Sequence, residues 1–123
     1  MADSPGQTQP IVLPPSRPTI STHVLDTERG MPAEGIRVTL YRLDVGAAPI
    51  RMTQALTDSD GRVRDLLERP LTAGDYRLEF DFGTEEDAFF RRLALDLSVT
   101  DAGRSYHVPL LLASYSMTTY RGS

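Results

Sequence analysis

The chain has 123 residues and a formal net charge of −4 at pH 7, with 40% hydrophobic and 24% charged residues. These values are typical of one soluble globular domain and argue against a nucleic-acid-binding protein, which would need a basic face. Cysteine and lysine are both absent, which excludes disulfides, cysteine nucleophiles, Schiff bases and a P-loop lysine. No stretch approaches the roughly 18 apolar residues of a membrane span, so we expect no membrane contact.

The first 18 residues form a proline-rich segment that differs from the rest of the chain. They contain five of the nine prolines and only three bulky aliphatic side chains, Ile11, Val12 and Leu13. This composition predicts a flexible arm over residues 1–18 and a folded domain over residues 19–123, with a docked edge segment as the alternative for the arm. The arm lacks the cationic start and apolar run of a secretory signal, so we expect a cytoplasmic protein.

From Ile20 onward, apolar and polar residues alternate with a period of two, which is typical of strands with one wet face. About seven or eight short strands, separated by turns rich in Gly and Asp, predict an all-β fold, a β-sandwich. One short helix is predicted to begin at Thr84 and to continue through about Phe90, because acidic residues follow the capping threonine.

Two runs, Ile20–Thr27 and Ser105–Ala113, are apolar on both faces. Such a pattern indicates that both faces are covered, most simply by another copy of the chain. If Val24 and Val108 point into the core, the opposite faces carry both histidines and two leucines: His23, Leu25, His107 and Leu111.

His23 and His107 are the chain's two histidines, so most of any acid–base chemistry must involve them. They are either two unrelated surface residues or a shared polar site in an apolar interface groove, where one could act as a general base near neutral pH. Two histidines alone are too few for a convincing zinc site.

Other candidate motifs give weaker support for a catalytic or metal site. The run Asp58-Ser59-Asp60-Gly61 is similar to part of a calcium loop, but further ligands and the terminal glutamate are missing. An Asx-type turn is therefore the favoured interpretation. No Gly-x-Ser-x-Gly elbow is present to support a serine triad.

Longer motifs follow one another along the chain. They are Ile20-Ser21-Thr22-His23-Val24-Leu25-Asp26-Thr27, then Asp60-Gly61-Arg62, then Tyr106-His107-Val108-Pro109-Leu110-Leu111-Leu112, and finally Tyr120-Arg121-Gly122-Ser123. Together they resemble the signatures of the 5-hydroxyisourate hydrolases, the enzymatic relatives of transthyretin, over about residues 20–123. Arg91, Ala113-Ser114 and Met117 depart from the family pattern. Met117 lies, by the period of two, on the face opposite Tyr120, so we expect these changes to affect packing more than chemistry.

The resemblance implies a transthyretin-like β-sandwich of two four-stranded sheets with one short helix. It also implies a homotetramer, a dimer of dimers, whose central channel holds the sites. The implied reaction opens the six-membered ring of 5-hydroxyisourate by amide hydrolysis, giving 2-oxo-4-hydroxy-4-carboxy-5-ureidoimidazoline in urate degradation. A transthyretin-like module that binds a ligand without turnover is the alternative, and a purely structural interaction domain is a third possibility.

The resemblance also implies the residues of the site. His23, Arg62, His107 and Ser123 are expected to be catalytic, and Tyr120, Arg121 and Gly122 to bind substrate. A neutral imidazole would take a proton from water, and the Arg62 guanidinium would stabilise the oxyanion or hold the substrate's carbonyl groups. No metal or organic cofactor is expected. The sequence leaves open which histidine is the base.

Overall fold

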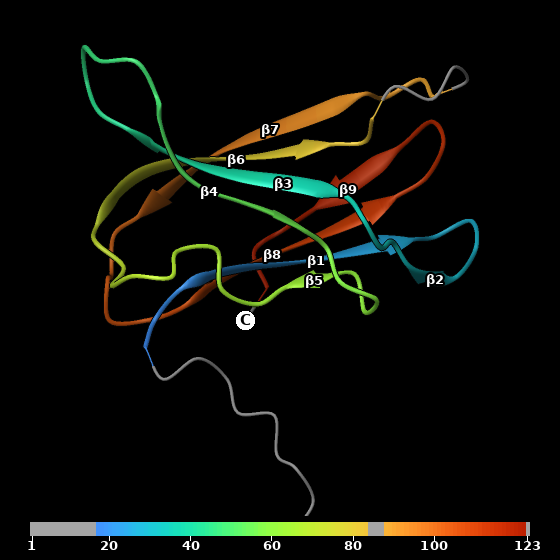
Figure 1. The fold of residues 1–123 in the computed structure, drawn as a ribbon, viewed down its shortest axis with the longest axis horizontal. Helices are drawn as coiled ribbons and strands as arrows, with labels where there is room; N and C mark the ends of the chain where they lie inside the picture. Colours follow the sequence, from blue (N-terminus) through green and yellow to red (C-terminus); the bar gives the residue numbers. More distant parts are fainter. Residues whose placement is uncertain (1–16, 84–87, 123) are drawn as a thin grey trace, which may run out of the picture.

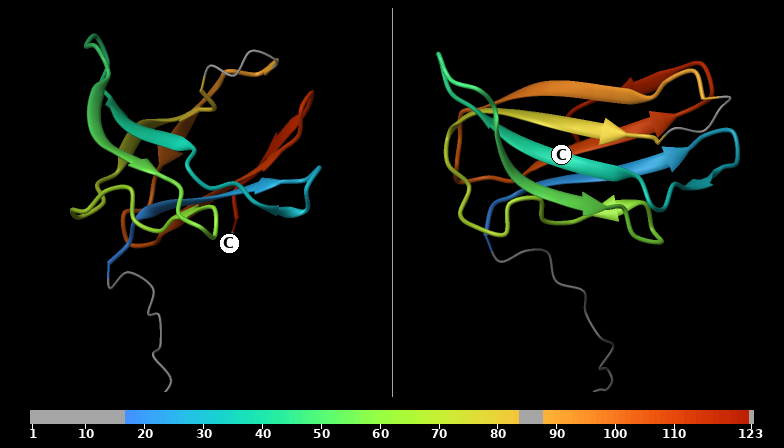
Figure 2. Two further views of the ribbon diagram at one scale, coloured as in Figure 1. Left: turned by 45° about the vertical axis from the view of Figure 1, so that its right-hand side comes forward. Right: turned by 45° about the horizontal axis from the view of Figure 1, so that its top comes forward.

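Two β-sheets pack face to face in the computed structural model, which describes residues 17–83 and 88–122 (Figures 1 and 2). The first sheet has the order β2-β1-β8-β9, and β5 also pairs with β1. Its strands are β1 (Ile20–Asp26), β2 (Met31–Pro32), β5 (Arg62–Val63), β8 (Tyr106–Leu112) and β9 (Met117–Thr119). The second sheet has the order β4-β3-β6-β7, formed by β4 (Ile50–Leu56), β3 (Arg37–Leu43), β6 (Gly74–Asp81) and β7 (Arg92–Val99).

The core lies between the two sheets and follows the alternation predicted from the sequence. On β1, Ile20 and Val24 are fully buried, and on β6 the residues that alternate with polar ones, Tyr76, Leu78 and Phe80, are also fully buried. The alternating apolar residues of β1 and β6 therefore meet in one core, and the intervening residues remain on the outer faces.

β1 and β8 pair in parallel, although every other strand pair is antiparallel. Their register runs from Ile20 opposite Tyr106 to Asp26 opposite Leu112. Figure 1 shows the two strands side by side in the lower layer. The parallel pair joins the beginning of the folded domain to its end and brings both histidine-bearing motifs into one sheet.

The structure corrects the sequence-based fold in two details. The first sheet has five strands instead of four, because the two-residue β5 joins the edge of β1. No helix occurs within residues 17–83 and 88–122, and residues 88–90 of the predicted helix are not helical. Residues 84–87 of that helix lie outside the described residues, as do residues 1–16 of the predicted arm.

Strand β4 contains an irregularity that periodicity does not reveal. The register between β3 and β4 shifts at Leu40/Tyr41, so that Leu40 pairs with Thr53 and Tyr41 pairs with Arg51. Met52 is thus the extra residue of a bulge, and both Met52 and Thr53 are half-buried. A bulge interrupts the period of two on which the prediction depends.

Within the described part of the chain, no helix is long and apolar enough to cross a membrane.

Candidate active site

The outer face of the first sheet brings together residues from β1, β5 and β8. His23 on β1 lies directly opposite Arg62 on β5. On the other side of β1, Ser21 lies opposite His107 on β8, and Leu25 lies opposite Leu111. Because successive residues of a strand point to opposite faces, these side chains share the face turned away from the core.

The predicted orientation of the histidines is confirmed by burial. Val24 and Val108 are in the core, with 0% and 6% of their surface exposed. His23 and His107 are half-buried on the outer face, and so are Leu25 and Leu111. The outer face of a single chain thus presents two histidines and an arginine beside two partly exposed leucines.

A tight turn places Arg62 beside His23. Asp58 accepts hydrogen bonds at its Oδ1 from the backbone N–H groups of Asp60 and Arg62, each at 2.9 Å. The backbone N–H of Gly61 also donates to the carbonyl of Asp58 at 2.8 Å. These bonds confirm the predicted Asx-type turn. The N–H of Arg62 first, and also that of Asp60, lower the pKa of the Asp58 carboxyl because they favour its charged form.

Gly61 allows this turn to press against β1. Its φ is +75°, and its carbonyl accepts a hydrogen bond from the N–H of Val24 at 2.7 Å. A Cβ atom at this position would collide with the carbonyl oxygen of Val24. Glycine is therefore required both by the backbone conformation and by the close approach that sets Arg62 opposite His23.

The end of the chain returns to His107. The N–H of Gly122 donates to the carbonyl of His107 at 2.7 Å, and the two residues form an isolated antiparallel bridge. A Cβ on Gly122 would lie 2.9 Å from Cδ2 of the His107 ring, closer than real Cβ atoms approach. Gly122 therefore packs directly against the imidazole, and its lack of a side chain permits this contact.

The other residues of the closing tetrapeptide differ in position. Tyr120 is 54% exposed between β9 and the Gly122 bridge. The Arg121 guanidinium lies over the ring of the core residue Tyr106, 5.0 Å from its centroid, so it does not point at the histidines. Ser123 lies outside the described residues. The structure thus gathers His23, Arg62, His107 and Gly122, and places Arg121 apart from them.

Ser21 belongs to the site, although the sequence alone assigned it no role. Its Oγ lies 2.8 Å from Nδ1 of His107. The alternation on β1 places Ser21 and His23 on one face, but only the pairing of β1 with β8 reveals the contact with His107. Met117, in contrast, packs against the core opposite Leu112, on the face that the period of two predicts.

Burial and nearby positive charge both lower the pKa values of the two histidines. The pKa of His23 is lowered, first by burial and then by the Arg62 guanidinium, although the Asp60 backbone and the carboxylates of Asp60 and Asp58 oppose this. The pKa of His107 is lowered by burial, by Arg62 and by His23. The site therefore favours neutral imidazoles, the form that accepts a proton.

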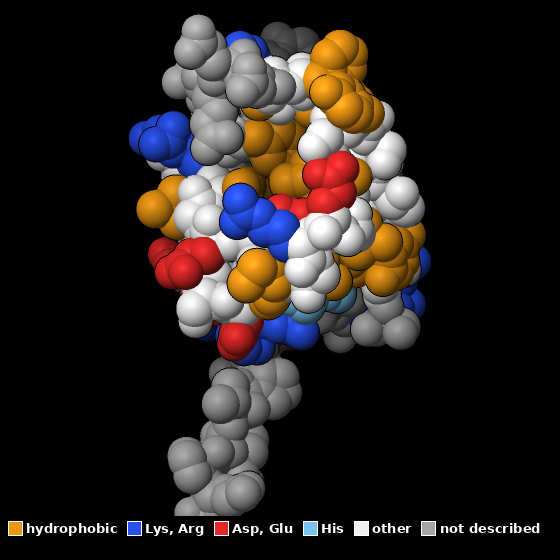
Figure 3. Space-filling model, turned by 90° about the vertical axis from the view of Figure 1, so that its right-hand side faces the viewer, with side chains coloured by type: hydrophobic (Ala, Val, Ile, Leu, Met, Phe, Trp, Pro, Cys, Tyr) orange, Lys and Arg blue, Asp and Glu red, His pale blue; other side chains and the backbone are white. Residues whose placement is uncertain are grey.

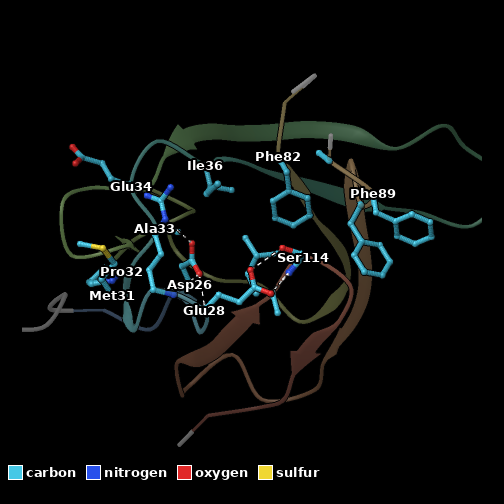
Figure 4. Close-up of a pocket in the computed structure, with 15 residues that line it drawn as sticks. Asp26, Glu28, Met31, Pro32, Ala33, Glu34, Ile36, Phe82, Phe89 and Ser114 are labelled. Carbon is cyan, nitrogen blue, oxygen red and sulfur yellow. Dashed lines mark hydrogen bonds and ion pairs between the residues drawn. The ribbon is translucent and has the colours of Figure 1, made fainter. Parts of the chain in front are cut away.

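A separate cavity of about 580 Å³ opens between the sheets at one end of the sandwich. Figure 3 views this end, with the hollow above and the histidine atoms on the underside. Figure 4 shows Ile36, Phe82 and Phe89 on one side of the cavity and Glu28, bonded to Ser114, on the other. Among the residues that the structure describes, no predicted site residue lines it. The histidine face of one chain is instead an open sheet surface.

Metal ligation has little support in the described residues. Across residues 17–83 and 88–122, no group of three or more His, Asp or Glu side chains is arranged to hold a metal ion. The polar groups on the outer face of β1, β5 and β8 are two imidazoles, a guanidinium and a hydroxyl. This set offers proton transfer and stabilisation of negative charge.

Comparisons with known proteins find relatives that match most of the chain. A curated relative, 5-hydroxyisourate hydrolase 2 of Rhizobium meliloti, is 40% identical over 115 residues, which cover 85% of this chain and 95% of the relative. The solved structure of Klebsiella pneumoniae 5-hydroxyisourate hydrolase is 33% identical and has a TM-score of 0.74, covering 86% of this chain and 99% of that one. Sea bream transthyretin in complex with thyroxine has a TM-score of 0.75 at 24% identity, covering 84% and 93%, and shows likeness of fold.

The match to a family is equally broad. The model of the HIUase/Transthyretin family matches residues 20–122, from the first residue of β1 to the glycine packed against His107. This chain therefore belongs to the HIUase/Transthyretin family.

Proposed function

We propose that this protein hydrolyses 5-hydroxyisourate, opening its six-membered ring at an amide bond to give 2-oxo-4-hydroxy-4-carboxy-5-ureidoimidazoline in urate degradation. One observation carries the proposal: two histidines with lowered pKa values lie beside an arginine on one face of the sheet. These residues lie within residues 20–122, which the family model matches, and the chain is 40% identical over 115 residues to a protein named 5-hydroxyisourate hydrolase 2.

The chemistry requires a base, an oxyanion partner and a proton donor. A neutral imidazole takes a proton from water as the water oxygen bonds to the amide carbon. The Arg62 guanidinium stabilises the negative charge that develops on the carbonyl oxygen, since it stays charged throughout. The C–N bond then breaks, and the imidazolium returns its proton to the leaving nitrogen. Water is the second substrate, and the proposed step requires no metal or organic cofactor.

The site is proposed to be completed by a homotetramer, a dimer of dimers. Leu25 and Leu111 lie on the same face as the histidines and are only half-buried in one chain. A second copy covering this face would bury the leucines and enclose the histidines in a channel. Tyr120, Arg121, Gly122 and Ser123 are proposed to close this site at the chain end. The flexible arm over residues 1–18 and the cytoplasmic location stay predictions.

An ultraviolet time course tests the activity. 5-Hydroxyisourate is generated from urate by urate oxidase, and its decay is followed with and without the protein. Because the substrate also hydrolyses spontaneously, the uncatalysed rate is subtracted. Faster decay that scales with protein concentration supports the hydrolase. Identical decay curves would refute it, and saturable binding of an aromatic ligand without a rate effect would favour the alternative, a binding module.

A further inference from the structure

The backbone fixes Ser21 and His107 in their relative positions. They are opposite residues in the parallel β1–β8 pair. On either side of them, the Tyr106 N–H donates to the carbonyl of Thr19 at 2.8 Å, and the Thr22 hydroxyl donates to the carbonyl of Val108 at 2.6 Å. The 2.8 Å separation between Ser21 Oγ and His107 Nδ1 is therefore set by two paired strands and not by mobile loops.

The imidazole of His107 is restrained at two of its atoms. Ser21 engages Nδ1, and Gly122 packs so closely that an added Cβ would lie 2.9 Å from Cδ2. Nε2 is then the ring nitrogen that can act on a substrate bound at the outer face. Since a neutral imidazole carries its proton on one nitrogen only, the partner of Nδ1 decides what Nε2 can do.

We propose that Ser21 is a positioning residue that holds His107 in the tautomer protonated at Nδ1. In this tautomer, Nδ1–H donates to Ser21 Oγ and Nε2 presents a lone pair. The Arg62 guanidinium on the same face disfavours the doubly protonated imidazolium, which leaves one of the two ring nitrogens without a proton. The inference rests on the proposed hydrolysis and assigns its base: Nε2 of His107 takes the proton of water as the oxygen bonds to the amide carbon.

The test compares Ser21→Ala, Ser21→Thr and the control Ser98→Ala in the full chain. Ser98 is an exposed strand residue on β7, in the other sheet. Long-range proton–nitrogen NMR of the ¹⁵N-labelled protein at neutral pH reports which nitrogen of His107 carries the proton. Steady-state kinetics on freshly generated 5-hydroxyisourate separates kcat from KM, and thermal unfolding verifies that each variant is folded.

We expect His107 of the wild type to be protonated at Nδ1, and Ser21→Ala to shift the proton toward Nε2. The same variant should lower kcat about three- to ten-fold with KM nearly unchanged, which corresponds to the loss of one hydrogen bond. Ser21→Thr keeps the hydroxyl and should restore both properties, and Ser98→Ala should change neither.

Several results would overturn the role of Ser21: a wild-type His107 protonated at Nε2, a tautomer or kcat unchanged in Ser21→Ala, or a Ser21→Thr variant as impaired as Ser21→Ala. The NMR measurement does not depend on turnover. If the wild type fails to accelerate decay of 5-hydroxyisourate, the proposed function fails by itself, and the NMR spectra still decide whether Ser21 holds the tautomer.

Discussion

The two histidines have lowered pKa values for shared reasons: burial acts first on each of them, and the Arg62 guanidinium acts next. A lowered pKa keeps an imidazole neutral in mildly acidic solution, where an ordinary histidine with a pKa of 6.5 begins to gain a proton. A general base must be neutral to accept a proton. The surroundings of His23 and His107 thus widen the pH range over which they can act.

Replacement of either histidine should abolish most turnover. His23→Ala and His107→Ala are each expected to reduce kcat by about two to four powers of ten, the range for general acid–base catalysis. Both side chains lie on the outer face, outside the core cluster, so the variants should remain folded. The ultraviolet decay assay measures kcat, and light scattering verifies assembly. Wild-type activity in both variants would contradict the assignment.

Neutralising Arg62 should raise the pKa of both histidines, because its positive charge disfavours their protonated forms. In Arg62→Gln, the NMR titration of each imidazole should therefore move to higher pH. Arg64→Gln is the matched control, since Arg64 is an exposed arginine that pairs with Asp60. Equal titration curves for wild type and Arg62→Gln would show that Arg62 does not lower the pKa values.

Two short segments act as elements that complete the site around the β1–β8 pair. The turn over residues 58–61 brings Arg62 to His23, and the end of the chain brings Gly122 to His107. In each segment a glycine makes the closest approach to the neighbouring strand. Neither segment has a large buried surface of its own, so backbone hydrogen bonds and the absence of a side chain determine its position.

Gly61→Ala should displace Arg62 and reduce stability. The substitution introduces both a strained positive φ and a collision with the Val24 carbonyl, at a cost of about 1–3 kcal/mol or more in the free energy of unfolding. Gly30→Ala is the control, because Gly30 has a similar φ of +67° but open space around its Cβ position. Denaturant unfolding and the decay assay measure both variants. Equal losses in the two would mean that close packing against β1 contributes nothing.

Deleting residues 121–123 should remove most turnover and leave the thermal midpoint nearly unchanged. The deletion removes the Gly122–His107 bridge and the contact of Arg121 with Tyr106, but no residue of the core cluster. The decay assay and a thermal melt measure the two effects. A C-terminal affinity tag should also impair activity, and an N-terminal tag should not. Full turnover after the deletion would remove Ser123 from the site.

At the scale of the whole molecule, the proposed function depends on the outer face of the first sheet. It carries the candidate site, yet the described cavity of about 580 Å³ lies elsewhere, between the sheets. An open sheet face does not exclude water, and exclusion of water strengthens the electrostatic interactions on which oxyanion stabilisation depends. The proposed tetramer would place a second copy of the chain over this face and exclude water from it.

Leu111→Asp should split the tetramer, most simply into dimers. Each fully buried leucine contributes about 1.5–3 kcal/mol, and symmetry repeats both this contribution and the introduced charge in every subunit. Leu56→Asp is the control, because Leu56 is 60% exposed on β4 in the other sheet. Light scattering at micromolar concentration measures the mass. A monomeric wild type would end the hypothesis of a tetramer.

The sequence by itself predicted the sandwich, the core faces of the main strands and the outward direction of both histidines. These features depend on the period of two, which is a local property of an extended backbone. The motifs likewise identified the family, because they are read directly from neighbouring residues. Where local regularity is missing, the sequence carries little strand signal: the bulge at Met52 interrupts the period of two in β4, and the two-residue β5 is too short to show a period.

Tertiary structure alone decided which distant residues meet. The parallel register of β1 and β8 puts Ser21 against His107, which lies 86 residues further along the chain, and the pairing of β5 with β1 puts Arg62 opposite His23. It also places the Arg121 guanidinium over the Tyr106 ring, a contact that the sequence did not indicate. Register and pKa values arise from contacts between strands and from burial. Residue order along one strand does not contain either of them.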